Sequence, residues 1–228
     1  MKYMMDLLKN SKLKKWFLFS ALLIGYLTFE VIYLLIGIDF TNITKELYII
    51  LSLIKYLFFM FLLIIINRKY LKEKIIDFKN NFKPYAIISF KDWFTGFLIM
   101  LIVNITISSF ISGLGENEAE VQNLISKIPV MAFFMTTIFA PFNEEMIFRK
   151  SLKDCVNNKY LYMILSGFIF GLVHVMGSSN PYEYLLIISY GALGFMFAHT
   201  LVKTDNIFCT IMMHLLHNGI LTILAMVV

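Results

Sequence analysis

Residues 47–66, LYIILSLIKYLFFMFLLIII, form an apolar run in which Lys55 is the only charged side chain. At a rise of 1.5 Å per residue, a helix of this length is about 30 Å long, which matches the hydrocarbon core of a bilayer. A helix also satisfies its backbone hydrogen bonds within one segment, as lipid surroundings require. The run therefore predicts a membrane-spanning helix.

The composition of the whole chain agrees with this run. Of the 228 residues, 59% are hydrophobic and 15% are charged, and the mean hydropathy is +0.77, whereas about a quarter of a soluble domain is charged. Alternating apolar runs of the kind that build a barrel are not seen. The predicted fold class is all-α, a polytopic transmembrane helical bundle. Seven spans are predicted, at about 16–38, 47–66, 93–113, 129–148, 160–177, 183–202 and 206–228.

The basic residues predict the orientation of the bundle. If the spans alternate in direction, all but three of the 20 Lys and Arg residues fall on one side, the exceptions being Lys45, Lys55 and Lys127. Because short cytoplasmic loops carry the excess of Lys and Arg, we expect the N-terminus inside and the C-terminus outside. The net charge of +5 is this loop bias seen in sum, so we expect no nucleic-acid partner.

We expect one membrane domain in two parts, a two-span region 1–92 and a core 93–228. Segment 67–92 alternates Lys with Ile, Phe and Tyr, which predicts an amphipathic segment on the cytoplasmic membrane surface; a substrate-docking site is the alternative. The first span is longer than the apolar part of a signal peptide and no A-x-A-like cleavage site follows it, so we expect it to be retained. Cys155 and Cys209 do not suggest a disulfide framework.

Charged residues inside spans are costly and are functional candidates by default. Glu30 and Lys55 lie roughly 17–21 Å from the predicted cytoplasmic ends of their spans, and an ion pair between neighbouring helices explains them. The other candidates are Glu144, Glu145, Arg149, His174, His199, His214 and His217.

The stretch 141–150, PFNEEMIFRK, places two adjacent carboxylates and an arginine directly after an uncharged run. If the helix ended at Arg149, Glu144 would lie only about 7 Å from the inner surface. His174 lies about 22 Å from that surface, so the two side chains could not cooperate.

A longer helix brings these groups to one depth. The residues after Arg149 permit a helix, and Asn157 is a plausible stop. If the helix continues to about Asn157, Glu144 lies about 20 Å in, level with Asn218, and His214 lies about 13 Å in. We therefore expect the carboxylates to lie inside the bundle.

The angles around that helix separate the two carboxylates. Arg149 is about 40° from Glu145 and about 140° from Glu144. We expect Arg149 to neutralise Glu145, which leaves Glu144 to face elsewhere. Pro141 lacks an N–H, frees the carbonyl of Thr137 and predicts a kink just before the pair. The alternative is a structural ion-pair cluster at a helix end.

The histidines lie in the last three predicted spans. Gly167 and Gly171 form a GxxxG pair near His174, so a neighbouring helix can approach closely there. His214, His217 and Asn218 share an arc of about 100° on the last span. His199 is expected to be structural.

These side chains can activate water. A carboxylate beside an imidazole, here Glu144 with His174, can act as a general base and later as a proton donor. A neutral His214 and the amide of Asn218 can donate hydrogen bonds to an oxyanion. Glu144, His174 and His214 are also an acceptable Zn²⁺ ligand set, and spacing does not choose between the two.

Three motifs carry a family resemblance. E-E-x-x-x-R at Glu144, Glu145 and Arg149, F-x-x-x-H at Phe170 and His174, and H-x-x-x-N at His214 and Asn218 resemble those of the CPBP family. This family comprises the CaaX-prenyl-protease and bacteriocin-processing intramembrane endopeptidases, and the resemblance covers residues 129–222. It implies that Glu144 and His174 activate the water, His214 and Asn218 stabilise the oxyanion, and Glu145 and Arg149 support them. His217 is not a motif position and is expected to be a supporting residue.

The resemblance also implies a cavity open to the cytoplasm and leaves participation of Zn²⁺ open. We predict a multi-pass endopeptidase of a cell membrane, cutting a peptide or membrane protein near the cytoplasmic side. The Lys-, Ile- and Asn-rich composition indicates a bacterial source. One alternative is a non-catalytic immunity or scaffold protein with the same fold. Another is an ion-coupled carrier, which the lack of a visible internal repeat disfavours.

Overall fold

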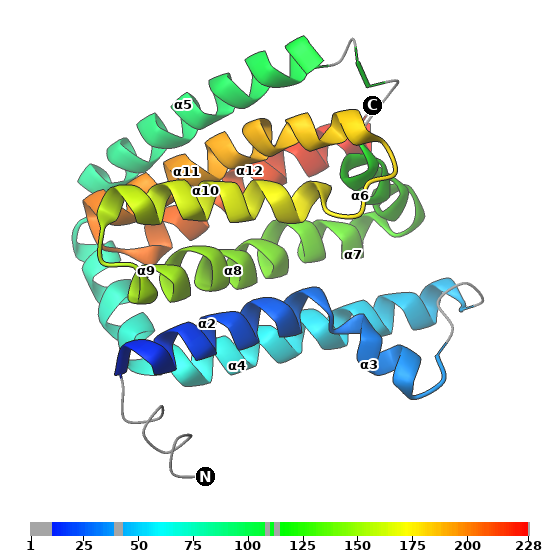
Figure 1. Ribbon diagram of the computed structural model, residues 1–228, viewed down its shortest axis with the longest axis horizontal. Coiled ribbons are helices and arrows are strands. Elements are labelled where there is room, and N and C mark those ends of the chain that lie inside the picture. The colour runs from blue at the N-terminus through cyan, green and yellow to red at the C-terminus, as the bar shows by residue number, and fades with distance from the viewer. Residues whose placement is uncertain (1–10, 39–42, 108–109, 112–114, 228) are drawn as a thin grey trace.

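The computed structural model describes residues 11–38, 43–107, 110–111 and 115–227. The described residues form helices and no strand, which confirms the all-α class. Figure 1 shows α2 and α4 along one face of the bundle and α5 along the opposite face. The helices outside residues 129–155 are α2 (Ser11–Leu27), α3 (Glu30–Leu35), α4 (Lys45–Asn80), α5 (Phe82–Ile107), α6 (Glu116–Lys127), α10 (Lys159–Val175), η3 (Pro181–Leu185), α11 (Leu186–Thr204) and α12 (Ile207–Val227).

Four helices of the described chain are long and apolar enough to cross a membrane, and α10 is a shorter apolar helix. The first predicted span is broken between α2 and α3, and the fourth is interrupted by π-helical turns. The last residues of the predicted span 93–113 lie outside the described residues. The count of seven spans and the orientation stay predictions. The four long helices cover Glu46–Asn80, Phe82–Ile107, Pro181–Thr204 and Ile207–Val227.

Helix α4 bends at Asn67, whose backbone leaves the helical region (φ −108°, ψ 15°) and whose amide donates to the carbonyl of Leu63 at 3.0 Å. Beyond the bend the chain crosses one end of the bundle and enters α5 (Figure 1). Segment 67–92 is therefore helical and lies across that end, as an amphipathic connecting segment can. Its place on a membrane surface stays a prediction.

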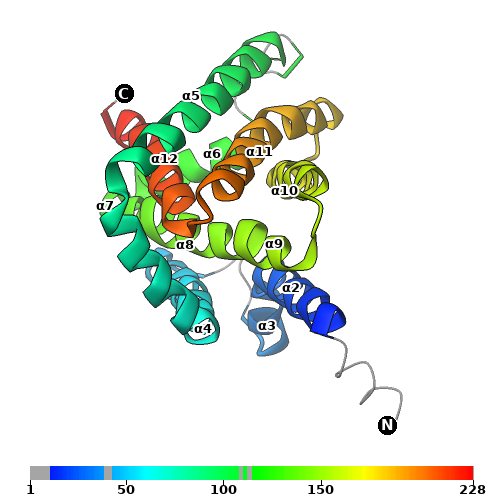
Figure 2. The same cartoon turned by 90° about the vertical axis from the view of Figure 1, so that its left-hand side faces the viewer.

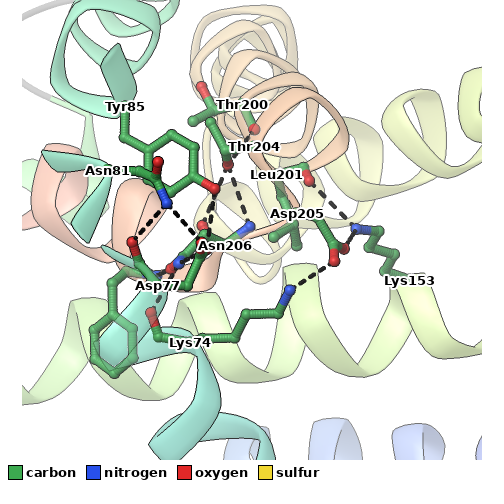
Figure 3. Close-up of polar contacts among 11 residues, drawn as sticks. Lys74, Asp77, Asn81, Tyr85, Lys153, Thr200, Leu201, Thr204, Asp205 and Asn206 are labelled. Atoms are coloured by element: carbon green, nitrogen blue, oxygen red, sulfur yellow. Dashed lines mark hydrogen bonds and ion pairs between the residues drawn. The ribbon is translucent and has the colours of Figure 1, made fainter. Parts of the chain in front are cut away.

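A polar network ties this connecting segment to the turn between α11 and α12 (Figure 3). The amide of Asn206 donates to the carbonyl of Lys74 and to Asp77 Oδ2, both at 2.8 Å. Asp205 accepts from Lys74 at 2.6 Å and from Lys153 of α9 (Leu152–Cys155) at 2.7 Å. Three elements far apart in sequence thus meet at one end of the bundle.

The predicted close approach at the GxxxG pair is confirmed. A Cβ added at Gly167 would lie 2.7 Å from the carbonyl oxygen of Gly191, and one at Gly171 would lie 2.4 Å from that of Ile187. Helices α10 and α11 therefore pack backbone against backbone, which only glycine permits at these two positions.

Residues 129–155 form one irregular helical rod between α2 and α4 on one side and α10–α12 on the other (Figures 1 and 2). The predicted continuation past Arg149 is confirmed, and the helix ends at Cys155, slightly before the expected stop at Asn157. The rod consists of α7 (Pro129–Phe134), η1 (Met135–Phe139), α8 (Ala140–Glu144), η2 (Glu145–Ser151) and α9 (Leu152–Cys155), of which η1 and η2 are π-helical.

The predicted ion pair between Glu30 and Lys55 is confirmed. Lys55 Nζ lies 2.6 Å from Glu30 Oε1 and joins α3 to α4. The same ammonium lies 5.1 Å from the ring centre of Tyr26, so Lys55 also contacts an aromatic face.

Candidate active site

Pro141 determines what Asn218 binds. In the π-helical turn before it, the N–H of Ala140 bonds to the carbonyl five residues earlier. The next donor in that series would be Pro141, which has no N–H. The carbonyl of Thr136 instead accepts from the amide of Asn218 at 2.9 Å. The irregularity expected at Pro141 therefore takes the form of a π turn, and the freed carbonyl is that of Thr136 rather than Thr137.

The pairing of Arg149 with Glu145 is also confirmed. Arg149 Nε lies 3.3 Å from Glu145 Oε2, and both side chains are fully buried. The guanidinium carbon lies 4.1 Å from the ring centre of Phe170 and 5.5 Å from that of Phe197. Within the described chain, none of the guanidinium nitrogens makes a hydrogen bond. Arg149 is therefore held by opposite charge and by aromatic faces.

His214 lies between the two carboxylates. Its Nδ1 is 2.8 Å from Glu145 Oε1, and its Nε2 is 3.8 Å from Glu144 Oε2. Because an ionised carboxylate only accepts hydrogen bonds, Nδ1 carries a proton. The side chain of His214 is 3% exposed and that of Glu144 is 16% exposed, so the ring separates a dry interior from a more open side.

His174 is held by two contacts. Its Nδ1 lies 2.8 Å from the carbonyl of Phe170, which fixes the proton at Nδ1 and leaves Nε2 as an acceptor in the neutral ring. The imidazole stacks on Tyr190, with ring centres 4.6 Å apart and planes at 25°. The hydroxyl of Tyr190 accepts from Asn117 of α6 at 3.4 Å. No motif or charge in the sequence pointed to Tyr190.

A cavity of about 210 Å³ brings most of the candidate residues together. The predicted catalytic set Glu144, His174, His214 and Asn218 lines it, together with His217. These side chains come from α8, α10 and α12, whereas Glu145 and Arg149 are buried behind His214. Phe170 also lines the cavity while stacking on Arg149.

The two remaining histidines have different surroundings. His217 accepts at Nδ1 from the indole N–H of Trp93 at 3.4 Å, which fits a supporting residue. His199 is absent from the cavity lining and pairs with Asp92 of α5 at 3.0 Å. This contact agrees with the structural role expected for His199.

The cavity extends toward α6 and the last turns of α12, where Leu221 and Ala225 line it. In Figure 1 this end of the bundle is opposite to the end where α9 meets α10. If the Lys-rich end faces the cytoplasm, the cavity reaches toward the other face of the membrane. The predicted orientation and the implied cytoplasmic opening therefore conflict.

The three predicted Zn²⁺ ligands Glu144, His174 and His214 all line the cavity. Among the described residues, no three His, Cys, Asp or Glu side chains are grouped so that they could hold a metal ion. Glu144, His174 and His214 are not grouped as metal ligands in this arrangement, and the Zn²⁺ set stays a prediction.

Comparison with known proteins supports the interpretation of the motifs. The family model of Rce1-like type II CAAX prenyl endopeptidases matches residues 126–220. The chain is therefore similar to the Rce1-like family over this region. All three motifs lie inside the match, so the resemblance drawn from the sequence is confirmed. No solved structure matches the chain.

Three curated bacterial proteins are similar to this chain. It is 30% identical to "Putative membrane peptidase YdiL" of Bacillus subtilis over 52% of this chain and 48% of that protein. It is 24% identical to "Membrane-embedded CAAX protease MroQ" of Staphylococcus aureus over 69% of this chain and 64% of that protein. It is 26% identical to "UPF0177 protein YvdC" of Lactococcus lactis over 75% of this chain and 65% of that protein. The chain thus spans between about half and two thirds of the length of these relatives.

Proposed function

We propose that the chain is a bacterial intramembrane endopeptidase that hydrolyses a peptide or membrane protein with a water activated by Glu144 and His174. The observation that carries this proposal is the shared cavity, which Glu144, His174, His214 and Asn218 all line. The match to the Rce1-like family and the similarity to the staphylococcal CAAX protease support it.

The reaction begins with water held between Glu144 and His174 Nε2. Glu144 accepts a proton as the water oxygen attacks the peptide carbonyl carbon. His174 orients the same water, because its Nδ1 proton is fixed by the carbonyl of Phe170. Glu144 then returns the proton to the leaving nitrogen, and the carbon–nitrogen bond breaks.

Asn218 and His214 stabilise the charge that develops on the carbonyl oxygen. One hydrogen of the Asn218 amide is used on the carbonyl of Thr136, and the second is available for the oxyanion. His214 uses its Nδ1 proton on Glu145, so it needs a second proton at Nε2 to donate. This revises the sequence expectation of a neutral ring. A ring that donates from both nitrogens carries a positive charge, which together with Arg149 would match the charge of the two carboxylates.

Variants at the two water-activating residues test the proposal. Glu144→Gln and His174→Ala should abolish cleavage of a membrane peptide while the purified variants insert and fold like the wild type. Unchanged cleavage or cellular phenotype in both would contradict the proposal and favour the non-catalytic immunity or scaffold role. Loss of cleavage on chelation, restored by Zn²⁺, would show that a metal takes part.

The proposal also includes the side of the membrane on which the substrate is cut. From the resemblance we infer cleavage near the cytoplasmic side, which requires the α6 end of the cavity to be reached from the cytoplasm. The bias of Lys and Arg predicts the opposite placement of that end.

Labelling with a membrane-impermeant maleimide distinguishes these cases. Lys127→Cys reports on the last residue of α6, and Lys203→Cys on the opposite end of the bundle. The native Cys155 and Cys209 are buried. Labelling of Lys127→Cys only after permeabilisation supports cytoplasmic cleavage, and its labelling in intact cells contradicts it.

A further inference from the structure

Helix α6 forms one wall of the cavity, although no family motif lies on it. Its residues share the cavity with the proposed catalytic set and come from a segment that separates α5 from the rod 129–155. A substrate in the cavity would therefore contact α6. The lining residues from this helix are Asn117, Glu118, Val121, Gln122 and Ile125.

Three carboxylates lie in the first half of α6, and their surroundings differ. Glu116 accepts from the backbone N–H of Ser179 at 3.0 Å. Glu120 lines a separate cavity that Lys127 also lines. Glu118 faces the active-site cavity and, within the described chain, has no hydrogen-bond or ion-pair partner.

The environment of Glu118 disfavours an isolated negative charge. The side chain is half-buried, and burial raises the pKa of its carboxyl above the usual range. A carboxylate in such a place gains from a nearby cation, because the cation offsets the lost hydration. Among the described residues that line the cavity there is no Lys or Arg, and His214 lies between Glu144 and Glu145, so none of these side chains is paired with Glu118.

The cavity is therefore suited to a cation on the substrate. We propose that Glu118 selects substrates that carry a Lys or Arg side chain close to the bond that is cut. The two carboxylates in the lining, Glu118 and Glu144, would repel a free C-terminal carboxylate at the same place. The preferred bond is then an internal one beside a basic residue. The inference that a bond is cut rests on the proposed function. The inference that basic substrates are selected rests on the environment of Glu118.

Matched peptides test the selection. An apolar membrane-inserting peptide carries Lys, Gln or Glu at one position, which is scanned along the sequence. At one position, wild-type enzyme should cleave the Lys peptide with a kcat/KM about tenfold above that of the Gln peptide, and the Glu peptide more slowly still; tenfold corresponds to about 1.4 kcal/mol. Glu118→Gln should reduce the ratio of kcat/KM between the Lys and Gln peptides to about one. Glu118→Lys should reverse it.

Glu120→Gln is the matched control, because it removes a carboxylate from the same helix without changing the active-site cavity. It should keep the wild-type preference. A preference that survives in Glu118→Gln would overturn the inference, as would an equal loss with all three peptides.

A binding measurement separates this inference from the proposed function. In a Glu144→Gln background, which the proposed mechanism makes inactive, the Lys peptide should bind about tenfold tighter than the Glu peptide. Adding Glu118→Gln should remove the difference. Equal binding of both peptides before that change contradicts selection by Glu118, whether or not any peptide is cleaved. Absence of cleavage with selective binding contradicts only the proposed function.

Discussion

The two ring nitrogens of His214 have different surroundings. Nδ1 faces a fully buried ion pair, which we call the dry side, and Nε2 faces the cavity, which we call the open side. On the first side, Glu145 and Arg149 are fully buried and the guanidinium lies between aromatic rings. On the second side, Glu144 is partly exposed and lines the cavity. Two glutamates adjacent in sequence thus occupy different environments on either side of one imidazole.

The difference shows how a helix can give identical side chains different chemistry. Successive residues turn by about 100°, so one carboxylate points to the interior and the next to the cavity. Arg149 gives Glu145 a permanent counter-charge, whereas the ion-pair partner of Glu144 in the described chain is the titratable His214. A carboxylate that must exchange protons benefits from the second arrangement.

Removing the charge on the open side should have the largest effect. Glu144→Gln should lower kcat by about 10²- to 10⁴-fold, because it removes the general base and proton donor. The unfolding free energy should change little, since the amide fits the partly exposed position. Steady-state cleavage and denaturant unfolding of the same preparation measure both. A loss of unfolding free energy as large as the rise in activation free energy would mean that Glu144 has a structural role.

Substitutions in the buried pair of Glu145 and Arg149 should lower the unfolding free energy. Arg149→Met leaves Glu145 buried without its cation and should cost about 3–5 kcal/mol of unfolding free energy. The double variant Glu145→Gln/Arg149→Met should recover much of this loss, because neither charge is then left alone. Unfolding in detergent micelles measures the cycle. Additive losses would show that the two side chains do not act as a pair.

The sequence predicted the dry side better than the open side. The pairing of Glu145 with Arg149 follows from local helical geometry, and the GxxxG approach follows from glycine spacing; both were confirmed. The ion pair of Glu30 with Lys55 followed from the cost of charge in lipid. Each prediction rests on local helical geometry or on the large free-energy cost of an unpaired charge in lipid.

The rest depends on contacts that spacing does not reveal. A π-helical turn changed which carbonyl Pro141 frees, because the hydrogen bonds shift by one residue. Tyr190 stacks on His174 across two packed helices, and α6 reaches the cavity through tertiary packing. Neither carried a charge pattern or a motif that pointed to the site.

Tyr190 offers a way to sharpen the comparison on the open side. Tyr190→Leu removes the stacking partner of His174 and should lower kcat about tenfold, in line with the worth of an aromatic pair, while KM stays near the wild-type value. Tyr190→Phe keeps the stack, loses the bond from Asn117 and should retain most of the activity. Steady-state kinetics separates kcat from KM. Equal losses in both variants would assign the effect to the hydroxyl.

The pair of Glu30 with Lys55 is a reference for both sides of His214, because it is an ion pair away from the cavity. Its side chains are 46% and 17% exposed, so they can relax when a partner is lost. We expect the smallest effect here, with a coupling on the order of 1 kcal/mol in the cycle of Glu30→Gln, Lys55→Met and the double variant. Each single variant leaves one charge unpaired, whereas the double leaves none, so the double should be more stable than the sum of the singles predicts.

Activity per folded molecule should equal that of the wild type in all three. A loss of kcat without loss of stability would place this pair in the catalytic machinery and would break the distinction between charges that hold the fold and charges that act on substrate.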